Sequence, residues 1–508
     1  MDFLLSSATI ALSTLLSRVF GLIRDIFFAK YLGTGMASDV FFTAYRLPNF
    51  FRTLFAEGAF SAAFVPILSS YMVDRSREET KEFLKNMFSL LLYSILLFTV
   101  LIELLMPQIV SIIASGFSTD TEKYQLAVSL SRITFPYLIF ISLSSFMSGV
   151  LHAHEKFLVV AMNPVLLNLV FILSSLLSHL FGKNVSHVLS YAVLVGGALQ
   201  FMFVFLAVVG QGIVLYPAGI KIDQTTRRFA KSFSSALMSS GIDQINSIVS
   251  LIMLSRMAGA ISHVYYADRL VQLPTSLVGT AIGVSILPLL SRRLGQNDSE
   301  KFVIQENALL VALFLALPSM IYLYKLSHIF VPILFERGEF TAASSAAVVG
   351  CARIYAGALP AFILSKILQS IFFSNGDTKT PMISAMISLV SNVVLALILT
   401  GYMGYRGIIL ASVLSAYLDF ASLLLILLAR KQLVLSERFV LGSAKIVYAL
   451  VPMVLVLLVC EKFIPSGRMI APGFVKLVIT VFLSGMVYLT VSYLTGVFRL
   501  RKYAPSNS

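Results

Sequence analysis

Long apolar runs separated by short polar loops dominate the sequence. Most runs contain about 20 residues, the length of α-helix that crosses the hydrocarbon core of a bilayer. The pattern predicts about fourteen membrane-spanning helices with short connections. The predicted spans are residues 3–29, 37–70, 86–113, 127–151, 158–181, 187–210, 229–257, 263–290, 304–325, 344–373, 382–401, 407–429, 444–461 and 473–497.

The composition is typical of a polytopic, all-α membrane protein. The 508 residues are 58% hydrophobic and 12% charged, with a mean hydropathy of +0.90, whereas a soluble protein carries about 25% charged residues. The first apolar run is too long and too polar for a cleaved signal peptide, so we expect it to be retained. Cys351 and Cys460 both lie in apolar runs, which indicates neither a disulfide framework nor a metal site.

Basic residues gather in alternate loops. The loops after the second, sixth, eighth and twelfth spans contain Arg75, Arg77, Lys81, Lys85, Lys221, Arg227, Arg228, Lys231, Arg292, Arg293, Lys301, Arg430, Lys431, Arg438 and Lys445. Because cytoplasmic loops retain lysine and arginine, and the span number is even, both termini are predicted to be cytoplasmic. The loop between Lys462 and Lys476, which contains Arg468, is the exception. The net charge of +14 is therefore interpreted as a topology signal and not as a nucleic-acid surface.

The sequence also repeats itself at a nearly constant offset. Residues 38–42 resemble residues 262–266, residues 65–69 resemble residues 287–291, and residues 168–170 resemble residues 392–394. Spans one to six therefore look like a copy of spans seven to twelve, related by an axis along the membrane normal. The predicted domains are an N-lobe at residues 1–210, a C-lobe at 211–430, and a helix pair with a basic tail at 431–508.

Charged residues lie inside several predicted spans, where each costs about 2.5–3.5 kcal/mol on insertion scales and normally faces a wet cavity. Arginine offers a planar fork of donors that matches phosphate oxygens, so a group of arginines favours an anionic cargo such as a pyrophosphate. The candidate substrate-binding residues are Arg18, Arg24, Asp25, Arg52, Arg256 and Arg269, with Ser17, Asn163 and Gln244 as hydrogen-bonding neighbours.

An alternative interpretation gives these arginines a structural role. In that case they neutralise Asp25, Asp39, Glu57, Asp243 and Asp268 in buried ion pairs. Gating or structural roles are predicted for Asp39 and Glu57. Asp243 could also bind a sodium ion or a proton, with Asn392 and Asp419 completing an oxygen-rich site. The alternative for that group is an interhelical hydrogen-bond network.

No enzyme motif is present in the sequence. Because it lacks a P-loop and an HExxH motif, the pattern favours neither an ATP-driven pump nor a metalloenzyme. Transport would then draw on an ion gradient, the membrane potential or the gradient of the cargo. No bound cofactor is predicted.

Four segments in the first two predicted spans closely resemble one transporter family. Residues 17–25, 37–42, 46–52 and 57–66 are similar to the MurJ (MviN) lipid II flippases of the MOP exporter superfamily, and weaker similarities occur at 163–164, 268–270 and 375–377. The resemblance implies an inner-membrane protein that moves lipid II, the undecaprenyl-pyrophosphate-linked peptidoglycan precursor, from the cytoplasmic to the periplasmic leaflet by alternating access.

The resemblance also assigns roles to residues. It implies that Arg24, Arg52 and Arg256 bind the pyrophosphate, that Arg18 and Arg269 are essential cationic neighbours, and that the last two spans hold the polyprenyl tail. Some relatives resemble sodium-coupled carriers, but the eleventh span here offers Ser388 and Asn392 with no carboxylate. Coupling of transport to sodium and coupling to the membrane potential both stay open.

The sequence is thus interpreted as a lipid II flippase that is not an enzyme. The alternatives are another MOP-type exporter, for a polysaccharide-lipid or a drug, and a non-transporting cell-wall scaffold. The expected partners are lipid II and membrane phospholipids, with cell-wall synthesis proteins as further candidates. We expect a monomer and no nucleic-acid partner.

Overall fold

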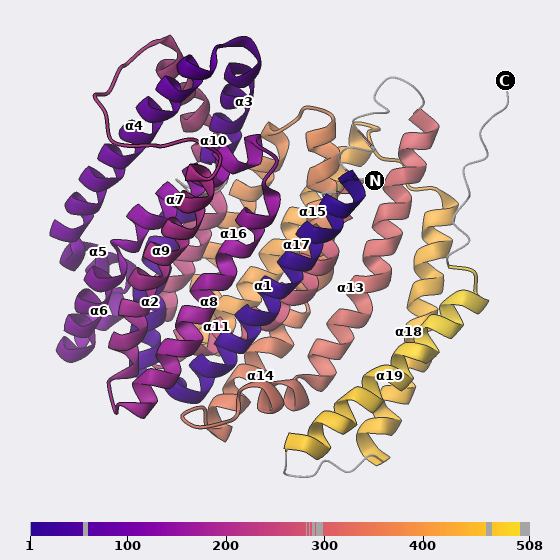
Figure 1. Cartoon of the computed structure of the whole chain (residues 1–508). Coiled ribbons are helices and arrows are strands. Elements are labelled where there is room, and N and C mark those ends of the chain that lie inside the picture. Colours follow the sequence, from indigo (N-terminus) through magenta and orange to yellow (C-terminus); the bar gives the residue numbers. More distant parts are fainter. Residues whose placement is uncertain are drawn as a thin grey trace, which may run out of the picture. The chain divides into compact units, whose positions relative to one another are not determined.

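The computed structural model describes residues 2–53, 59–280, 282–283, 285–286, 290, 298–463 and 470–497. These ranges are almost entirely helical and contain no β-strand, as Figure 1 shows. The predicted all-α membrane class is therefore confirmed. Within the described ranges, 9 helices are long and apolar enough to span a membrane, or 10 if one bent pair forms a single span. The full count of fourteen stays a prediction.

The chain divides into two compact units. The first contains residues 1–262 and 337–341, and the second contains residues 263–336 and 342–508. The lobe boundaries expected from the repeat, at residues 210 and 430, stay a prediction.

Most of the first unit consists of helices, several of them long and apolar enough to span a membrane. They are α1 (Asp2–Leu32), α2 (Met36–Arg52), α3 (Ala59–Asp74), α4 (Arg77–Leu104), α5 (Met106–Ile113), the short η2 (Ser115–Thr119), α6 (Thr121–Thr134), α7 (Tyr137–Ala153), α8 (Phe157–Leu180), α9 (Val185–Val209) and α10 (Gln224–Leu254). Helix α1 packs along α8, and α9 packs against both α7 and α8. A phenylalanine-rich core that includes Phe64, Phe83, Phe88 and Phe146 joins α3, α4 and α7.

Local sequence signals set several helix ends in this unit. Ser76 and Glu79 form a capping box at the start of α4. Asp223 accepts the backbone N–H of Thr226 at the start of α10, and this hydrogen bond lowers the pKa of Asp223. The predicted span 86–113 is broken at Leu105, where α4 ends and α5 begins. Pro107 explains the break, because proline lacks an N–H and favours the first turn of a new helix.

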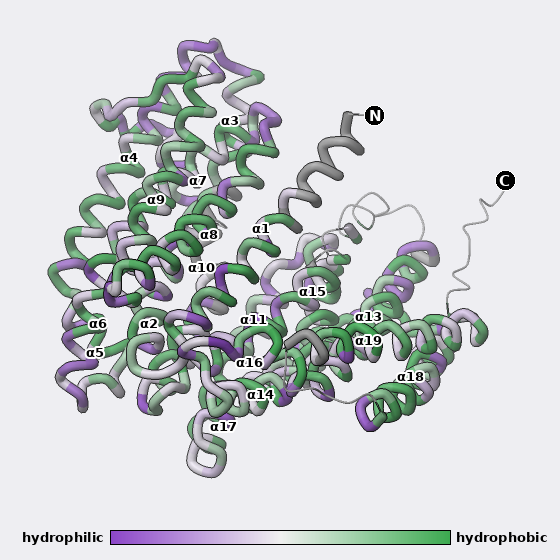
Figure 2. The backbone as a smooth tube through the Cα atoms, turned by 60° about the horizontal axis from the view of Figure 1, so that its bottom comes forward, coloured by the Kyte–Doolittle hydropathy of each residue, from purple (hydrophilic) through white to green (hydrophobic). Residues whose placement is uncertain are grey.

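The second unit is also helical. It begins within α11 (Ala260–Pro274). The elements that follow are the π-helical η3 (Thr275–Thr280), α13 (Asp298–Phe335), α14 (Ala342–Ala356), α15 (Leu359–Ser374), α16 (Lys379–Met403), α17 (Tyr405–Ala429), α18 (Glu437–Phe463) and α19 (Ile470–Leu494). Helix α16 packs along α17, and α18 packs along α19. Figure 2 shows that apolar residues run along most of these helices, with polar residues at many of their ends.

The loop between α15 and α16 has a charged anchor. Asp377 accepts hydrogen bonds from the backbone and side chain of Thr380 and forms an ion pair of 2.7 Å with Arg430. Partial burial by itself raises the pKa of Asp377, but the bonds from Thr380 and Arg430 outweigh it and lower the pKa to about 2. Asp377 is therefore charged at neutral pH, which keeps this anchor closed.

Candidate functional site

Arg24 lies in the C-terminal half of α1 and is almost buried. Its side chain is 11% exposed and pairs with Asp25, whose side chain is 4% exposed, at 2.8 Å. Arg24 Nη1 also donates to Asn168 Oδ1 on α8 at 2.9 Å, and its guanidinium lies over the rings of Phe28 and Phe171. Helix packing thus fixes the position of this guanidinium inside an apolar helix pair.

Asn168 belongs to this group but was not predicted as a site residue. Its side chain joins two helices, because Oδ1 accepts from Arg24 while Nδ2 donates to the carbonyl oxygen of Ser17 at 3.3 Å. The available signal was its place in the internal repeat, where it corresponds to Asn392. Asn168 thus links the Arg24–Asp25 pair and the backbone of Ser17 to α8, and the substrate-binding roles of Ser17, Arg24 and Asp25 stay predictions.

Arg18 and Arg52 are the other two candidate arginines on the first two helices. Arg18 is half-buried on α1 and makes no hydrogen bond or ion pair within the described residues. Arg52 lies in the last turn of α2, where its Nε donates to Asn49 Oδ1 at 3.0 Å. Phe171, which lies under Arg24, also contacts Tyr45 on α2. Tyr45 lies seven residues before Arg52, which is about 10 Å along α2. Since Phe171 contacts both Arg24 and Tyr45, Arg52 lies about 10 Å further along α2 than the level of Arg24.

Asp39 forms a fully buried clasp at the first turn of α2. Its carboxylate accepts the backbone N–H groups of Gly259 at 2.8 Å and Ser262 at 3.0 Å, together with the Ser262 hydroxyl at 2.9 Å. Lys123 on α6 pairs with the same carboxylate at 3.5 Å. A carboxylate at the N-terminus of α11 is favoured by the unpaired N–H groups there. The clasp therefore ties α2, α6 and α11 together.

Arg256 lies at the opposite end of α2 from Arg52. Arg256 is exposed. It lies three residues before Gly259, whose backbone N–H donates to Asp39 in the first turn of α2. Asp39 and Arg52 are about 20 Å apart along the helix, at 1.5 Å per residue. The structure thus does not bring Arg52 and Arg256 together around one pyrophosphate-sized group. The sequence could not reveal this, because it depends on where the chain after α10 contacts α2.

Asn163 lies in a buried polar network between helices. Its Nδ2 donates to Ser144 Oγ on α7 at 2.9 Å, and its backbone carbonyl accepts from Gln200 on α9 at 3.1 Å. These contacts join α7, α8 and α9. Gln244 is half-buried on α10. Glu57 and the side chain of Asp243 lie outside the described residues, so their predicted roles stay predictions.

Arg269 belongs to the second unit. Its Nη1 donates to Gln272 at 2.9 Å, and its guanidinium lies 4.6 Å from the ring centre of Tyr265. Gln272 in turn donates to Asp268. Arg269 is therefore part of a polar cluster along one face of α11, in which Gln272 lies between the arginine and Asp268.

Two of the three residues of the candidate cation site, Asn392 and Asp419, have separate hydrogen-bond partners on α16 and α17. Asp419 on α17 accepts from Ser384 on α16, whereas Asn392 accepts from Ser412 at 3.5 Å. Ser384 and Asn392 are eight residues apart, about 12 Å along α16, so Asp419 and Asn392 lie at different levels of this helix pair. These contacts are interhelical hydrogen bonds, and the predicted cation site stays a prediction. No cluster of three or more metal-binding side chains occurs in the described part of the chain.

Lys366 on α15 is a charged residue that sequence reasoning missed. Most residues of this helix are buried, yet Lys366 is exposed. It lies nine residues before Asn375, about 13 Å along the helix. The side chain of Asn375, just after the end of α15, accepts a hydrogen bond from Lys301. The missed signal was the one that identified Arg24, a cation inside an apolar run.

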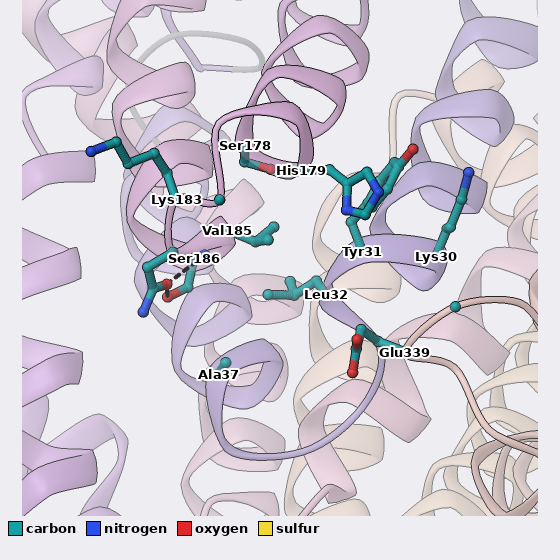
Figure 3. A pocket seen from close by; sticks show the side chains of 13 residues that line it. Lys30, Tyr31, Leu32, Ala37, Ser178, His179, Lys183, Val185, Ser186 and Glu339 are labelled. Carbon is teal, nitrogen blue, oxygen red and sulfur yellow. Dashed lines mark hydrogen bonds between the residues drawn. The ribbon is translucent and has the colours of Figure 1, made fainter.

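A cavity of about 460 Å³ lies in the first unit, at the ends of α1 and α8. Figure 3 shows Lys30, His179, Lys183 and Glu339 among the side chains that line it. Lys30 and His179 lie in the last turns of their helices, where cations complement the negative end of the helix dipole. These charges are accounted for by the helix ends, and we assign no ligand to the cavity.

One wall of this cavity is a tight backbone contact. The backbone N–H of Glu339 donates to the carbonyl oxygen of Lys30 at 2.9 Å. Gly33 and Gly338 flank this bond with φ angles of +64° and +58°, and a Cβ atom on either would strike backbone atoms of the other segment. Glycine is required twice here, for the left-handed backbone and for the close approach.

Gly338→Ala is therefore expected to destabilise the protein more than a matched substitution in open space. Gly182 has the same φ of +58° with no atom near its Cβ position, so Gly182→Ala should cost only the left-handed backbone penalty of about 1–2 kcal/mol. Thermal unfolding of both variants in detergent measures the difference. Equal melting temperatures would contradict the proposed close contact.

Comparisons with known proteins agree on one family. The model of a family described as lipid II flippase MurJ matches residues 28–499. The chain is 38% identical over 407 residues to a probable lipid II flippase MurJ of Rhizobium tropici, covering 79% of this chain and 76% of the relative. It is 29% identical over 518 residues to a probable lipid II flippase MurJ of Buchnera aphidicola subsp. Acyrthosiphon pisum, covering 100% of both chains.

Solved structures show the same likeness. A lipid II flippase MurJ in an inward closed conformation superposes with a TM-score of 0.80 at 26% identity, covering 96% of this chain and 98% of that one. An inward-facing multidrug resistance MATE family transporter of the MOP superfamily superposes with a TM-score of 0.65 at 16% identity, covering 82% and 96%. The second match shows a shared fold alone.

Proposed function

Because the chain belongs to the MurJ family of lipid II flippases, we propose that it carries lipid II from the cytoplasmic to the periplasmic leaflet by alternating access. It is a multi-pass protein of the inner membrane and a transporter, not an enzyme. In the proposed mechanism the arginines of the first two helices, Arg24 and Arg52 above all, bind the pyrophosphate of the cargo. Arg18 lies on the same helix as Arg24 and adds positive charge.

The observation that carries this assignment is the state of Arg24. A guanidinium inside an apolar helix is expensive, yet here Asp25, Asn168 and two aromatic rings hold it in one orientation. Such preorganisation reduces the conformational entropy that binding would otherwise cost. Phosphate oxygens match the donor fork of arginine better than a single ammonium group does.

Asp25 gives the site a way to release its cargo. The carboxylate neutralises Arg24 when no anion is bound, which spares the protein an unpaired buried charge. A pyrophosphate has to compete with Asp25 for the guanidinium donors of Arg24, and Asp25 recovers them when the cargo leaves. Because a buried carboxylate without its partner is costly, this competition weakens cargo binding and favours release, which suits a carrier better than a storage protein.

The Arg24–Asp25 pair also favours the second candidate, a non-transporting scaffold. That alternative expects the intramembrane arginines to pair with internal carboxylates, as Arg24 does. The family relationship supports transport over this alternative.

Further parts of the proposal concern topology and assembly. We propose that both termini lie in the cytoplasm, because the alternate loops with most lysine and arginine are then cytoplasmic. The chain is also proposed to act as a monomer.

Transport is tested directly in liposomes. Purified protein is reconstituted with fluorescent lipid II, and dithionite reduces the probe molecules in the outer leaflet. Rapid loss of more than the outer-leaflet fraction is expected with the protein, and not in protein-free vesicles or with equally labelled phosphatidylethanolamine. Loss limited to the outer leaflet under both an imposed sodium gradient and an imposed membrane potential would favour the scaffold.

A further inference from the structure

The loop that joins α9 and α10, residues 211–223, crosses the surface of α4 as an extended segment (Figure 1). Its side chains alternate between core and surface. Ile213 and Leu215 are 7% and 5% exposed and belong to the same core as Phe83. Val214 and Tyr216, between and after them, are 58% and 53% exposed. One face of the loop is thus buried and the other is apolar and open.

Polar side chains of α4 hold this loop in place. Asn86 makes two hydrogen bonds of 2.8 Å to the backbone of Lys221, donating from Nδ2 to the carbonyl and accepting the N–H at Oδ1. Ser89 Oγ accepts the N–H of Ala218 at 2.8 Å. These bonds satisfy backbone groups that would otherwise need water, so the loop is fixed on α4.

The outward face of the loop is unusually apolar for a connection between helices. Ile220 and Ile222 are 41% and 70% exposed, in addition to Val214 and Tyr216. Contiguous apolar groups on a surface indicate an interaction partner or a membrane. The loop is rigidly held, so its exposed side chains cannot simply fold inward.

The position of the loop along α4 indicates which partner. The run of exposed large apolar residues on α4 begins at Tyr93 and continues to Leu104, as expected for a lipid-facing surface. Ser89 and Asn86, which hold the loop, precede Tyr93 by about 6 and 10 Å along the helix. The headgroup layer of a bilayer is about 5–7 Å deep on each side. The loop therefore lies at the level of the headgroups.

Charge at this level favours an anionic surface. Lys85 donates to the Tyr216 hydroxyl at 2.7 Å and lies 4.1 Å from its ring centre. Arg227, Arg228 and Lys231 are exposed on the first turns of α10. Basic residues close to an anionic membrane each contribute about 1 kcal/mol of attraction, and tyrosine is enriched at membrane interfaces.

We propose that residues 211–223, together with the first turns of α10, form an interfacial anchor that binds anionic phospholipid headgroups. The apolar side chains enter the headgroup layer, and Arg227 and Arg228 contact lipid phosphates. This anchor holds the start of α10 at a fixed depth in the membrane. It is independent of the cargo, because it requires only bilayer lipid.

The absence of tryptophan from the sequence makes the depth of this loop measurable. Three single-tryptophan variants sample different levels near α4: Leu97→Trp on the lipid-facing surface, Ile220→Trp in the loop, and Val73→Trp at the end of α3, where the side chain is 84% exposed. Each is placed in nanodiscs of phosphatidylcholine with or without phosphatidylglycerol. Quenching by acrylamide and by lipids spin-labelled at the headgroup or on the acyl chain is then compared.

The Ile220→Trp variant is expected to be quenched best by the headgroup-labelled lipid and less by acrylamide than Val73→Trp. Leu97→Trp should respond best to the acyl-chain label. Phosphatidylglycerol should reduce acrylamide quenching of Ile220→Trp, and adding Arg227→Gln with Arg228→Gln should remove that effect. Three results would each overturn the proposal. Ile220→Trp could be quenched in the same way as Val73→Trp, it could be shielded from every quencher, as a second protein would shield it, or phosphatidylglycerol could leave its quenching unchanged.

Discussion

Arg24→Ala is expected to abolish growth when this protein is the only flippase in the cell. The substitution removes the preorganised guanidinium that we propose binds pyrophosphate. It also leaves Asp25 charged and nearly buried, and breaking a buried pair in this way costs about 3–5 kcal/mol. The single variant therefore combines a loss of cargo binding with a loss of stability, and these two effects have to be separated.

The double variant Arg24→Ala with Asp25→Asn separates them, because it removes the uncompensated charge. We expect it to reach near-normal levels in the membrane and still fail to support growth. Arg52→Ala, at the last turn of α2, should keep a normal level and also fail to support growth. Immunoblots of membrane fractions report the level. Growth supported by the double variant would show that Arg24 acts only through folding.

Asp39→Ala is expected to produce the largest loss of stability among single substitutions. It removes the acceptor for two backbone N–H groups and leaves Lys123 without its buried partner, with that side chain only 11% exposed. Loss of one member of a buried pair costs about 3–5 kcal/mol. Thermal unfolding in detergent should show a clear drop in melting temperature, with the start of α11 becoming accessible to protease first.

Two matched variants test the cause. Asp74 is exposed at the end of α3, and Asp74→Ala should change the free energy of unfolding by less than about 0.5 kcal/mol. Asp39→Asn alone leaves the Lys123 ammonium group without its partner. Adding Lys123→Met removes that charge, so the double variant should be more stable than Asp39→Asn. An Asp39→Ala protein as stable as Asp74→Ala would mean that the clasp does not hold these helices together.

The sequence was sufficient to predict helices and their class, because apolar runs of membrane-spanning length can satisfy their backbone groups only within the helix. It was also sufficient to identify Arg24, since a cation in such a run is energetically exceptional. The break at Leu105 escaped prediction because the apolar pattern continues through it, although Pro107 carried the signal.

The contacts between helices could not be predicted in the same way. The repeat aligned residues 38–42 with 262–266, but it did not show that Asp39 would touch Ser262, because correspondence in a repeat says nothing about packing. Asn168 was missed for the same reason, since only the packing of α1 on α8 brings it to Arg24. The separation of Arg52 from Arg256 likewise depends on where the chain after α10 contacts α2.

Selective binding of lipid II by the arginines is the central claim, and native mass spectrometry tests it most directly. Purified wild-type protein and the Arg24→Ala, Asp25→Asn, Arg52→Ala variant are each mixed with lipid II and an excess of phosphatidylglycerol. We expect wild-type protein to retain lipid II against the phospholipid and the variant to lose this preference while remaining folded. Equal retention of lipid II by both proteins would contradict the assignment of the pyrophosphate to these arginines.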